Sequence, residues 1–336
     1  MRPFRSGEAG YVGPGITFLR TPLVLDPAEL TGIDVAVLGA PFDEGVTYRP
    51  GTRFGPRAIR LADHSGIGGR AHMEVGVDPK AVLKIVDFGD IEAVPGDLLA
   101  SHALLRSHIG MILEKGAVPI VLGGDHSLSA PMMQAIADHH GPDGYAVIHF
   151  DTHADTGFLD EPTPYNHGTP FYRGVTEGFM RGDHIFQIGL RGTWPNPAEF
   201  DWMREVGFRW RTMDEVMSLG LNTVVAEAIA YATSKAPRVY LTVDIDVLDP
   251  AFAPGTGTPE PGGLMTRELL SAVRAIAGAV DLCAMDMVEV SPHYDVAEIT
   301  AQAAHRVVLE TLTGIALRRS GQSACPQRSR VVDFAR

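Results

Sequence analysis

Cysteine is scarce in this sequence. Only two of the 336 residues are cysteines, Cys283 in an apolar run and Cys325 in a polar segment near the C-terminus. Two such cysteines form neither a disulfide framework nor a Cys-x-x-Cys zinc site. Their scarcity favours a protein of a reducing compartment, and we expect it to work in the cytoplasm.

Long apolar runs and clustered basic residues are missing as well. No stretch approaches the roughly 20 apolar residues of a membrane-spanning helix, and the N-terminal MRPFRSGEAGYVGPG lacks the apolar segment of a signal peptide. The formal net charge is −13, with 28 Lys and Arg against 41 Asp and Glu. An acidic chain without a basic stripe would repel a nucleic acid. We therefore expect neither a membrane nor a nucleic acid as partner.

Nucleotide-binding loops are also not evident. The segments VLGAPFDEG and VLGGDHS follow apolar runs, but neither has the GxGxxG or GxxxxGK[ST] spacing that cradles phosphates. No internal repeat, low-complexity tract or linker divides the chain. We expect one domain over residues 1–336, with an irregular N-terminal arm at 1–30 and a C-terminal tail at 320–336.

What the sequence does have is a regular alternation of apolar runs and helical segments. The runs are mostly rich in Val and Ile, as in strands buried on both faces, and they lie at 34–40, 84–89, 117–124, 145–150, 184–190, 207–210, 238–245 and 283–290. Helical apolar spacing occurs between several of them, at 97–116 and 266–279, and again at 295–319. This alternation predicts an α/β fold with a central, mainly parallel sheet of about eight strands, covered by helices.

Three of the predicted strand ends carry side chains of the metal-ligand type. They occur in GGDHS (123–127), FDTHAD (150–155) and DID (244–246), at the strand ends beyond which α/β proteins bind their ligands. Residues two apart in an extended chain face the same side, so the acids and histidines within each motif converge. The candidate ligands are His126, Asp151, His153, Asp155, Asp244 and Asp246.

Four carboxylates crowded at one site repel one another unless cations compensate them. Two divalent cations would do so, and the two imidazoles complete a mixed donor set that suits Mn²⁺, Ni²⁺, Co²⁺ or Zn²⁺. Two ions roughly 3.5–4 Å apart would share a water and lower its pKa enough to form hydroxide near neutral pH. Each motif alone is as consistent with a polar turn or a solvated loop, but their joint occurrence after apolar strands favours a metal site.

Two neighbouring residues have alternative roles. His149 lies in phase with Asp151 inside the predicted strand, where it either supports a ligand or packs as a core histidine, and we favour the packed histidine. Asp125 either orients His126 or caps the turn that follows the strand.

These motifs, with APFDEGVTYRPGTRFGPRAIR (40–60), DIDVLDPAFAPGTGTPEPGG (244–263) and EVSP (289–292), resemble the signatures of the ureohydrolases, the arginase/agmatinase family, and most closely its agmatinase-like branch. The resemblance implies a three-layer α/β/α fold and a dinuclear site with Mn²⁺, or alternatively Ni²⁺, held by the six candidate ligands. It implies hydrolysis of a guanidino compound to urea and an amine by attack of a metal-bridging hydroxide. It also implies a homo-oligomer, either a trimer or a hexamer.

The resemblance assigns further residues to the substrate. Asp155 accepts a proton from the nucleophile, and Glu289 pairs with the guanidinium group. His167, in YNHGTPF, delivers a proton to the departing amine, and Thr258, in GTGTP, lines the substrate pocket. Without the resemblance, His167 is better explained as a loop histidine and Glu289 as a solvated acid at a strand end.

The loop between Asp155 and His167 bears on the choice of substrate. It lacks a convincing equivalent of the Asn and Ser that arginases use to hold the α-carboxylate and α-amino groups, so arginine is a poor candidate. Asp160 and Glu161 would favour a cationic tail such as that of agmatine, unless they are solvated loop acids. The segment 190–203 either adds aromatic walls to the pocket or packs beneath a subunit contact.

Several other functions remain open. The same chemistry could act on guanidinobutyrate, guanidinopropionate, free guanidine or a substituted guanidine. A deacetylase of the related fold uses a single zinc, and the complete set of six ligands argues against it. A structural or regulatory subunit that retains the fold is the non-enzyme alternative. About two metal ions per chain would support the amidinohydrolase, one the deacetylase and none the scaffold.

Overall fold

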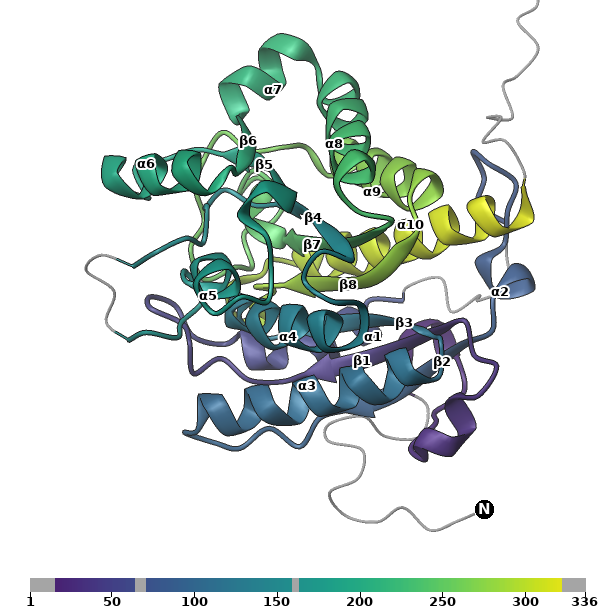
Figure 1. Cartoon of the computed structure of the whole chain (residues 1–336). Helices are drawn as coiled ribbons and strands as arrows, with labels where there is room; N and C mark the ends of the chain where they lie inside the picture. The colour runs from purple at the N-terminus through teal and green to yellow at the C-terminus, as the bar shows by residue number, and fades with distance from the viewer. Residues whose placement is uncertain (1–15, 64–70, 159–162, 322–336) are drawn as a thin grey trace, which may run out of the picture.

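The computed structural model describes residues 16–63, 71–158 and 163–321. It contains a single eight-stranded sheet, and all neighbouring strands in it are parallel (Figure 1). The strands are β1 (Val35–Ala40), β2 (Ile85–Asp90), β3 (Val118–Gly123), β4 (Tyr145–Phe150), β5 (Ile185–Leu190), β6 (Arg209–Thr212), β7 (Arg238–Asp244) and β8 (Leu282–Val288). The predicted parallel α/β fold is therefore confirmed.

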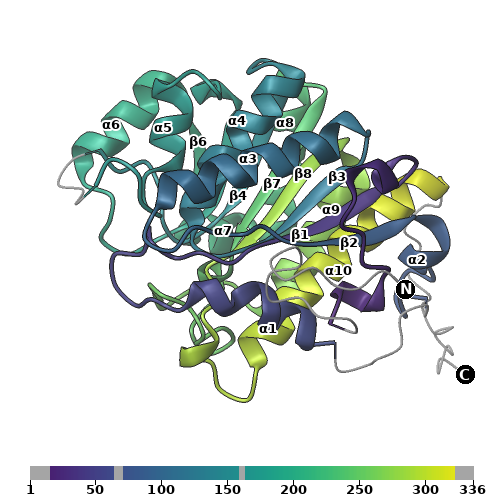
Figure 2. The same cartoon turned by 90° about the horizontal axis from the view of Figure 1, so that it is seen from below.

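Helices cover both faces of this sheet. They are α1 (Gly55–Leu61), α2 (Pro79–Val82), α3 (Leu98–Glu114), α4 (Ser129–His140), α5 (Pro170–Thr176), α6 (Pro197–Val206), α7 (Met213–Leu219), α8 (Leu221–Lys235), α9 (Thr266–Ala279) and α10 (Ile299–Ser320). Apolar side chains of α3 to α6 pack on one face, and those of α1 and α7 to α10 pack on the other (Figures 1 and 2). The result is the three-layer α/β/α arrangement, and it explains why most strands are apolar throughout.

Several element boundaries differ from the prediction by one or more residues, and two of these differences have a clear local cause. Strand β6 begins at Arg209, because the left-handed Gly207 (φ 92°) first ends α6. Helix α10 begins at Ile299 and not at 295, because the chain first makes a short 3-10 turn over Pro292–Tyr294. The Asp295 side chain then accepts the backbone N–H groups of Thr300 and Ala301. Local hydrogen bonding, which apolar spacing does not report, sets both boundaries.

The described part of the N-terminal arm is ordered by contacts with the sheet. Residues 16–30 contain two 3-10 turns, Phe18–Arg20 and Pro27–Leu30. The side chains of Phe18 and Leu30 are buried, and the Phe18 N–H donates to Asp87 in β2 at 2.7 Å. This described part of the arm has no long helix or strand, and its buried side chains belong to the core. Residues 1–15 and most of the predicted tail, from 322 onward, lie outside the described residues.

No single helix in the described ranges is long and apolar enough to span a membrane. Helices α7 and α8 reach such a length and hydropathy only when taken together, and they are bent by 107° relative to each other.

The order of the strands places the site. It runs β2-β1-β3-β8-β7-β4-β5-β6, so β3 and β4, which are consecutive in the chain, lie apart with β8 and β7 between them. In such sheets, ligands bind beyond the carboxyl ends of the strands where the order reverses. The register aligns these ends, because Phe150 pairs with Val243 and Asp244 pairs with Val288. The segments that follow β3, β4, β7 and β8 therefore meet at one edge of the sheet.

Candidate active site

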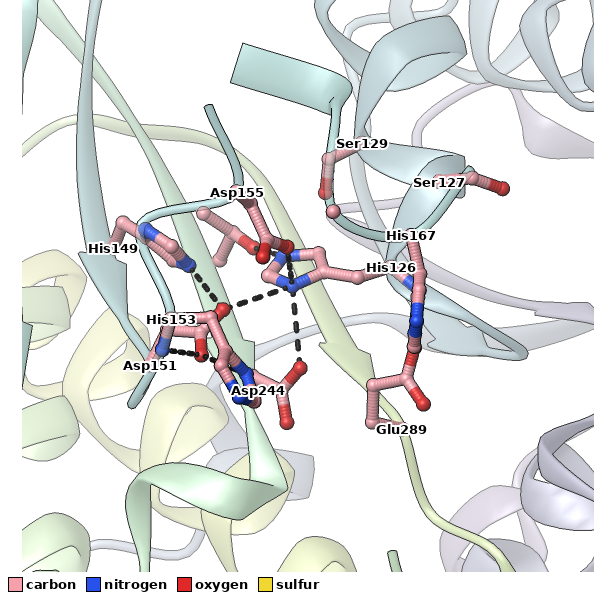
Figure 3. A network of polar contacts seen from close by, with 12 residues as sticks. His126, Ser127, Ser129, His149, Asp151, His153, Asp155, His167, Asp244 and Glu289 are labelled. Carbon is pink, nitrogen blue, oxygen red and sulfur yellow. Dashed lines mark hydrogen bonds and ion pairs between the residues drawn. The ribbon is translucent and has the colours of Figure 1, made fainter. Parts of the chain in front are cut away.

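All six predicted ligands come together at this edge. Figure 3 shows five of them, His126, Asp151, His153, Asp155 and Asp244. His126 follows β3 in a 3-10 turn, and it reaches its position after a close approach of two backbones. A Cβ atom on Gly124 would lie 2.2 Å from the Phe42 carbonyl oxygen, so only glycine fits there. Asp151, His153 and Asp155 follow β4, and Asp244 ends β7 with Asp246 beyond it.

The ligand atoms form two groups that share Asp151. In the first, His126 Nδ1 lies 2.9 Å from Asp155 Oδ2, 3.1 Å from Asp151 Oδ2 and 3.2 Å from Asp244 Oδ2. In the second, His153 Nδ1 lies 3.2 Å from Asp246 Oδ2 and 3.4 Å from Asp151 Oδ1. Asp151 thus presents one oxygen to each group, as a carboxylate does when it bridges two metal ions.

The first group has the properties of a cation site. His126 Nδ1 is buried and makes no well-directed hydrogen bond, although three carboxylate oxygens surround it. Its other nitrogen, Nε2, lies 2.9 Å from the Thr242 hydroxyl, which fixes the ring. Burial alone would lower the pKa of His126, but Asp155 and the two other carboxylates raise it well above its usual value. Nδ1 therefore requires a cation beside it, either a proton or a metal ion.

The carboxylates lead to the same conclusion. Burial, followed by the charges of Asp246 and Asp151, raises the pKa of Asp244 well above its usual range. Burial and Asp151 likewise raise the pKa of Asp155 to about 6. The upward direction of both shifts reflects burial and crowded negative charge, which the nearby histidines offset only in part. Two divalent cations would supply four positive charges, and the nitrogen and oxygen donors present fit them.

His149 does more than pack in the core. Its ring lies against Phe171, as a packed histidine would, but Nε2 also lies 2.9 Å from Asp151 Oδ2. The Gln187 amide in β5 donates to the Ala154 carbonyl at 2.7 Å, so its nitrogen faces His149 Nδ1 at 3.1 Å. Nδ1 is then the acceptor, and Nε2–H donates to Asp151. His149 lies near enough to His126 and Asp151 to form a third donor group, but this hydrogen bonding makes it a support for the shared ligand.

Replacing Gln187 by leucine should weaken metal binding without removing a ligand. His149 would lose the donor that fixes its tautomer, and the orientation of Asp151 would relax. Partners of this kind typically contribute ~10–100-fold in metal affinity, which a titration of metal-stripped protein with Mn²⁺ would measure. Gln134→Leu on α4 is the control and should change nothing. Equal affinities in the two variants would show that the His149 bond is incidental.

Glu289 and His167 form a pair beside the first group of ligands. Glu289 follows β8 with a left-handed backbone (φ 62°) that turns its side chain back into the site. Oε1 accepts the His126 N–H at 2.8 Å and faces His167 Nδ1 at 3.1 Å. Oε2 is buried and has no hydrogen-bond partner among the described residues. A Cβ on Gly257 would lie in contact with Oε2, at 3.4 Å, so the glycine leaves space beside this oxygen.

His167 has a partner in either protonation state. Burial lowers its pKa, but the charge and hydrogen bond of Glu289, together with the charges of Asp125 and Asp155, raise the pKa to about 9. The Thr47 hydroxyl lies 2.7 Å and the Thr47 backbone N–H 3.2 Å from Nε2. The imidazolium can donate to the hydroxyl, and the neutral ring can accept from the N–H. A group that passes a proton needs this freedom.

Asp125 has both of the roles considered for it. It accepts the Ser127 N–H at 2.9 Å and so caps the turn that carries His126. It also accepts the Gly45 N–H at 2.8 Å, which ties the segment holding Thr47 to the same turn.

A cavity of about 180 Å³ is lined by His167 and by four of the predicted ligands, His126, His153, Asp155 and Asp244. Thr258 lines it, as predicted, and also donates to Asp246 Oδ2 at 3.3 Å. From the segment 190–203, Trp194 lines the cavity, whereas Trp202 packs on Phe158 and Tyr172. Asp160 and Glu161 lie outside the described residues, and their influence on the substrate stays a prediction.

Two carboxylate–histidine groups that share one acid, beside a buried acid–histidine pair, define the site of a metal-dependent hydrolase. Comparisons with known proteins place it more narrowly. A profile of the arginase family matches residues 33–314. The chain is 42% identical over 296 residues to proclavaminate amidinohydrolase of Streptomyces clavuligerus, which covers 88% of this chain and 91% of that protein.

It is also 38% identical over 311 residues to guanidinobutyrase of Pseudomonas aeruginosa, covering 93% of this chain and 95% of that protein. The solved structure of a hypothetical agmatinase from Burkholderia thailandensis is similar with a TM-score of 0.82 at 35% identity, covering 94% and 97% of the two chains. The chain therefore belongs to the arginase family. It is a metal-dependent ureohydrolase that acts on a guanidino compound.

Proposed function

We propose that the protein hydrolyses a guanidino compound with an agmatine-like tail to urea and an amine, with two Mn²⁺ ions held by the two ligand groups. Ni²⁺ is the alternative metal. The observation that carries the choice of head group is the buried Oε2 of Glu289, which has no hydrogen-bond partner in the part of the chain that the structure describes. A buried carboxylate oxygen without a donor is costly. A guanidinium group supplies a cation with fixed N–H donors and would satisfy it.

The residues of the chain then have distinct tasks. When bound, a pair of divalent ions lowers the pKa of a shared water toward neutrality. Glu289 holds the guanidinium so that its carbon faces the ligand groups. Asp155 accepts the proton that the water gives up as its oxygen bonds to that carbon. His167 donates a proton to the nitrogen of the tail as the C–N bond breaks and the amine leaves. The remaining carbon product becomes urea when its hydroxyl proton is released to water.

The structure limits the tail of the substrate less than it limits the guanidinium head group. Asp160 and Glu161 favour a cationic tail by their charge. The resemblance to a guanidinobutyrase favours a guanidino acid as the second candidate. A urea-release screen on metal-stripped protein, restored with Mn²⁺ or Ni²⁺, tests both. We expect agmatine to give the highest kcat/KM. A higher value for guanidinobutyrate or guanidinopropionate would overturn the cationic tail, and no urea from any compound would overturn the function.

Changing Glu289 to glutamine should lower kcat/KM by a similar factor for every guanidino substrate. The charge-assisted contact becomes an ordinary hydrogen bond, which we expect to cost about 1–3 kcal/mol, or roughly 5–150-fold in kcat/KM. Steady-state kinetics with two substrates of different tails measure it. Glu177→Gln, at an exposed ion pair with Arg173, is the control. A loss confined to one substrate would mean that Glu289 contacts the tail and not the shared head group.

A further inference from the structure

The guanidinium group of Arg191, just after β5, is surrounded by backbone carbonyl groups. Nη2 lies 2.6 Å from the Glu260 oxygen and 2.8 Å from the Asp246 oxygen, and Nε lies 3.1 Å from the Pro261 oxygen. Further carbonyls at 3.3 Å belong to Gly189, Val247 and Leu248. Among the described residues, every hydrogen bond of the Arg191 side chain goes to a main-chain oxygen. Arg191 therefore holds backbone segments in place.

These segments are the ones that build the second ligand group. The Arg191 side chain binds the main chain at Asp246, which supplies one ligand. Its backbone N–H donates to the Thr152 carbonyl at 3.0 Å, between Asp151 and His153, which supply the other two. The same residue thus contacts both strand-end segments whose side chains meet at His153 Nδ1. Strands β4 and β7 pair with each other, but their pairing ends before these residues.

The contacts of the Arg191 guanidinium with the Glu260 and Pro261 carbonyl groups also link it to the wall of the substrate cavity. Glu260 and Pro261 follow Thr258, which lines the cavity and donates to Asp246 Oδ2 at 3.3 Å. The Thr258 segment is therefore tied to Asp246 twice, through its own hydroxyl and through the Arg191 guanidinium. A lysine could not replace this contact, because one ammonium offers three donors from a single point, whereas a guanidinium offers five in a plane.

We propose that Arg191 is a positioning residue that sets the second ligand group, Asp151, His153 and Asp246, at its working distance from the Thr258 wall of the cavity. Retention of the second metal ion and binding of the guanidino substrate then depend on the same side chain. The part that concerns substrate rests on the function proposed above, and the part that concerns the metal ion does not.

The test compares Arg191→Lys with Arg60→Lys. Arg60 is a buried arginine that pairs with Asp87 and Asp90 at β2, and β1, β3 and β8 separate that strand from β7. Mn²⁺ titrations of metal-stripped protein, counted by mass spectrometry, give the affinity of each ion. We expect Arg191→Lys to bind its first ion normally and its second ~10–100-fold more weakly. Its KM should rise, and its kcat at saturating Mn²⁺ should stay within a few fold of wild type. Arg60→Lys should lower Tm and leave both Mn²⁺ affinities unchanged.

Several results would overturn the proposal. One is an Arg191→Lys protein that binds both Mn²⁺ ions as tightly as wild type. Another is an Arg191→Lys protein whose Tm is lowered while both Mn²⁺ affinities stay unchanged, as expected for the Arg60 variant. Equal weakening of both ions would also contradict it. If the lysine variant does not fold, Arg191→Gln, with two donors to share between Asp246 and Glu260, answers the same question. A wild-type protein that releases no urea would remove the proposed function but leave the Mn²⁺ measurement valid.

Discussion

Asparagine in place of Asp151 is expected to release both metal ions and to abolish urea production while the fold remains. Asp151 is the one ligand that faces both histidine groups, with Oδ2 toward His126 and Oδ1 toward His153. Burial opposes its ionisation, but His149 and the other histidines hold its pKa well below its usual range. The carboxylate is thus a preformed negative centre. An amide is neutral and can present an N–H₂ group where a metal ion must lie.

The loss of metal affinity should exceed the ~10–100-fold that a supporting partner contributes. Metal content by mass spectrometry and far-UV circular dichroism, measured together, separate this outcome from unfolding. Asp183→Asn is the matched control, because Asp183 lies before β5 at the opposite edge of the sheet and pairs with Lys235. If the Asp151 variant kept two ions, the two-group description of the site would be wrong.

Removing the His167 side chain should leave the full metal content but slow turnover, in contrast to the Asp151 variant, which should lose its metal ions. His167 Nδ1 is engaged with Glu289, and Nε2 lies beside the Thr47 hydroxyl, so neither nitrogen faces a ligand group. We expect His167→Ala to lower kcat by ~10²–10⁴-fold, as for a lost general acid. His108→Ala on α3 is the control. Loss of metal ions from His167→Ala would make His167 a ligand and refute the six-residue set.

The same residue predicts a pH dependence. The acid form of His167 is the proton donor, and its pKa is raised to about 9. Its proton is present below that pH and absent above it, so kcat should fall as pH rises through about 9. Glu289→Gln removes the carboxylate that raises this pKa, and it should shift the fall to lower pH. A wild-type kcat that stays level from pH 8 to 10 would contradict the assignment of His167 as the acid.

Much of this architecture could be predicted from the sequence. Each of the eight apolar runs overlaps a strand, since a strand buried on both faces has a continuous apolar signal. The ligand motifs were visible because several acids and histidines followed such runs directly. Helices over the sheet were predicted in three places, but α4 and α8 were not, although both have buried apolar faces.

The supporting residues were harder to find. Gln187 did leave a signal, as the polar side chain inside an otherwise apolar strand, and Thr242 stands in phase with Asp244. Arg191 left none, because an arginine at a strand end is usually solvated, and its role depends on carbonyl groups from distant segments. Nor could the sequence predict strand order, which is set by the packing of the whole sheet. Because β8 and β7 lie between β3 and β4 in the sheet, Glu289 and Asp244 at their ends lie between His126, which follows β3, and the ligands that follow β4.

This order has a consequence for how the protein is made. Chain synthesis produces β1 to β6 before β7 and β8, yet the last two strands occupy the middle of the sheet. A nascent chain that ends before Arg238 contains the edges of the sheet without its centre, and the facing sides of β3 and β4 lack their native partners. Such unpaired strand edges are prone to aggregation. Formation of the native sheet during synthesis therefore waits for the C-terminal third of the chain, and the six-residue ligand set is complete only after β7 has been inserted, because Asp244 and Asp246 lie at its end.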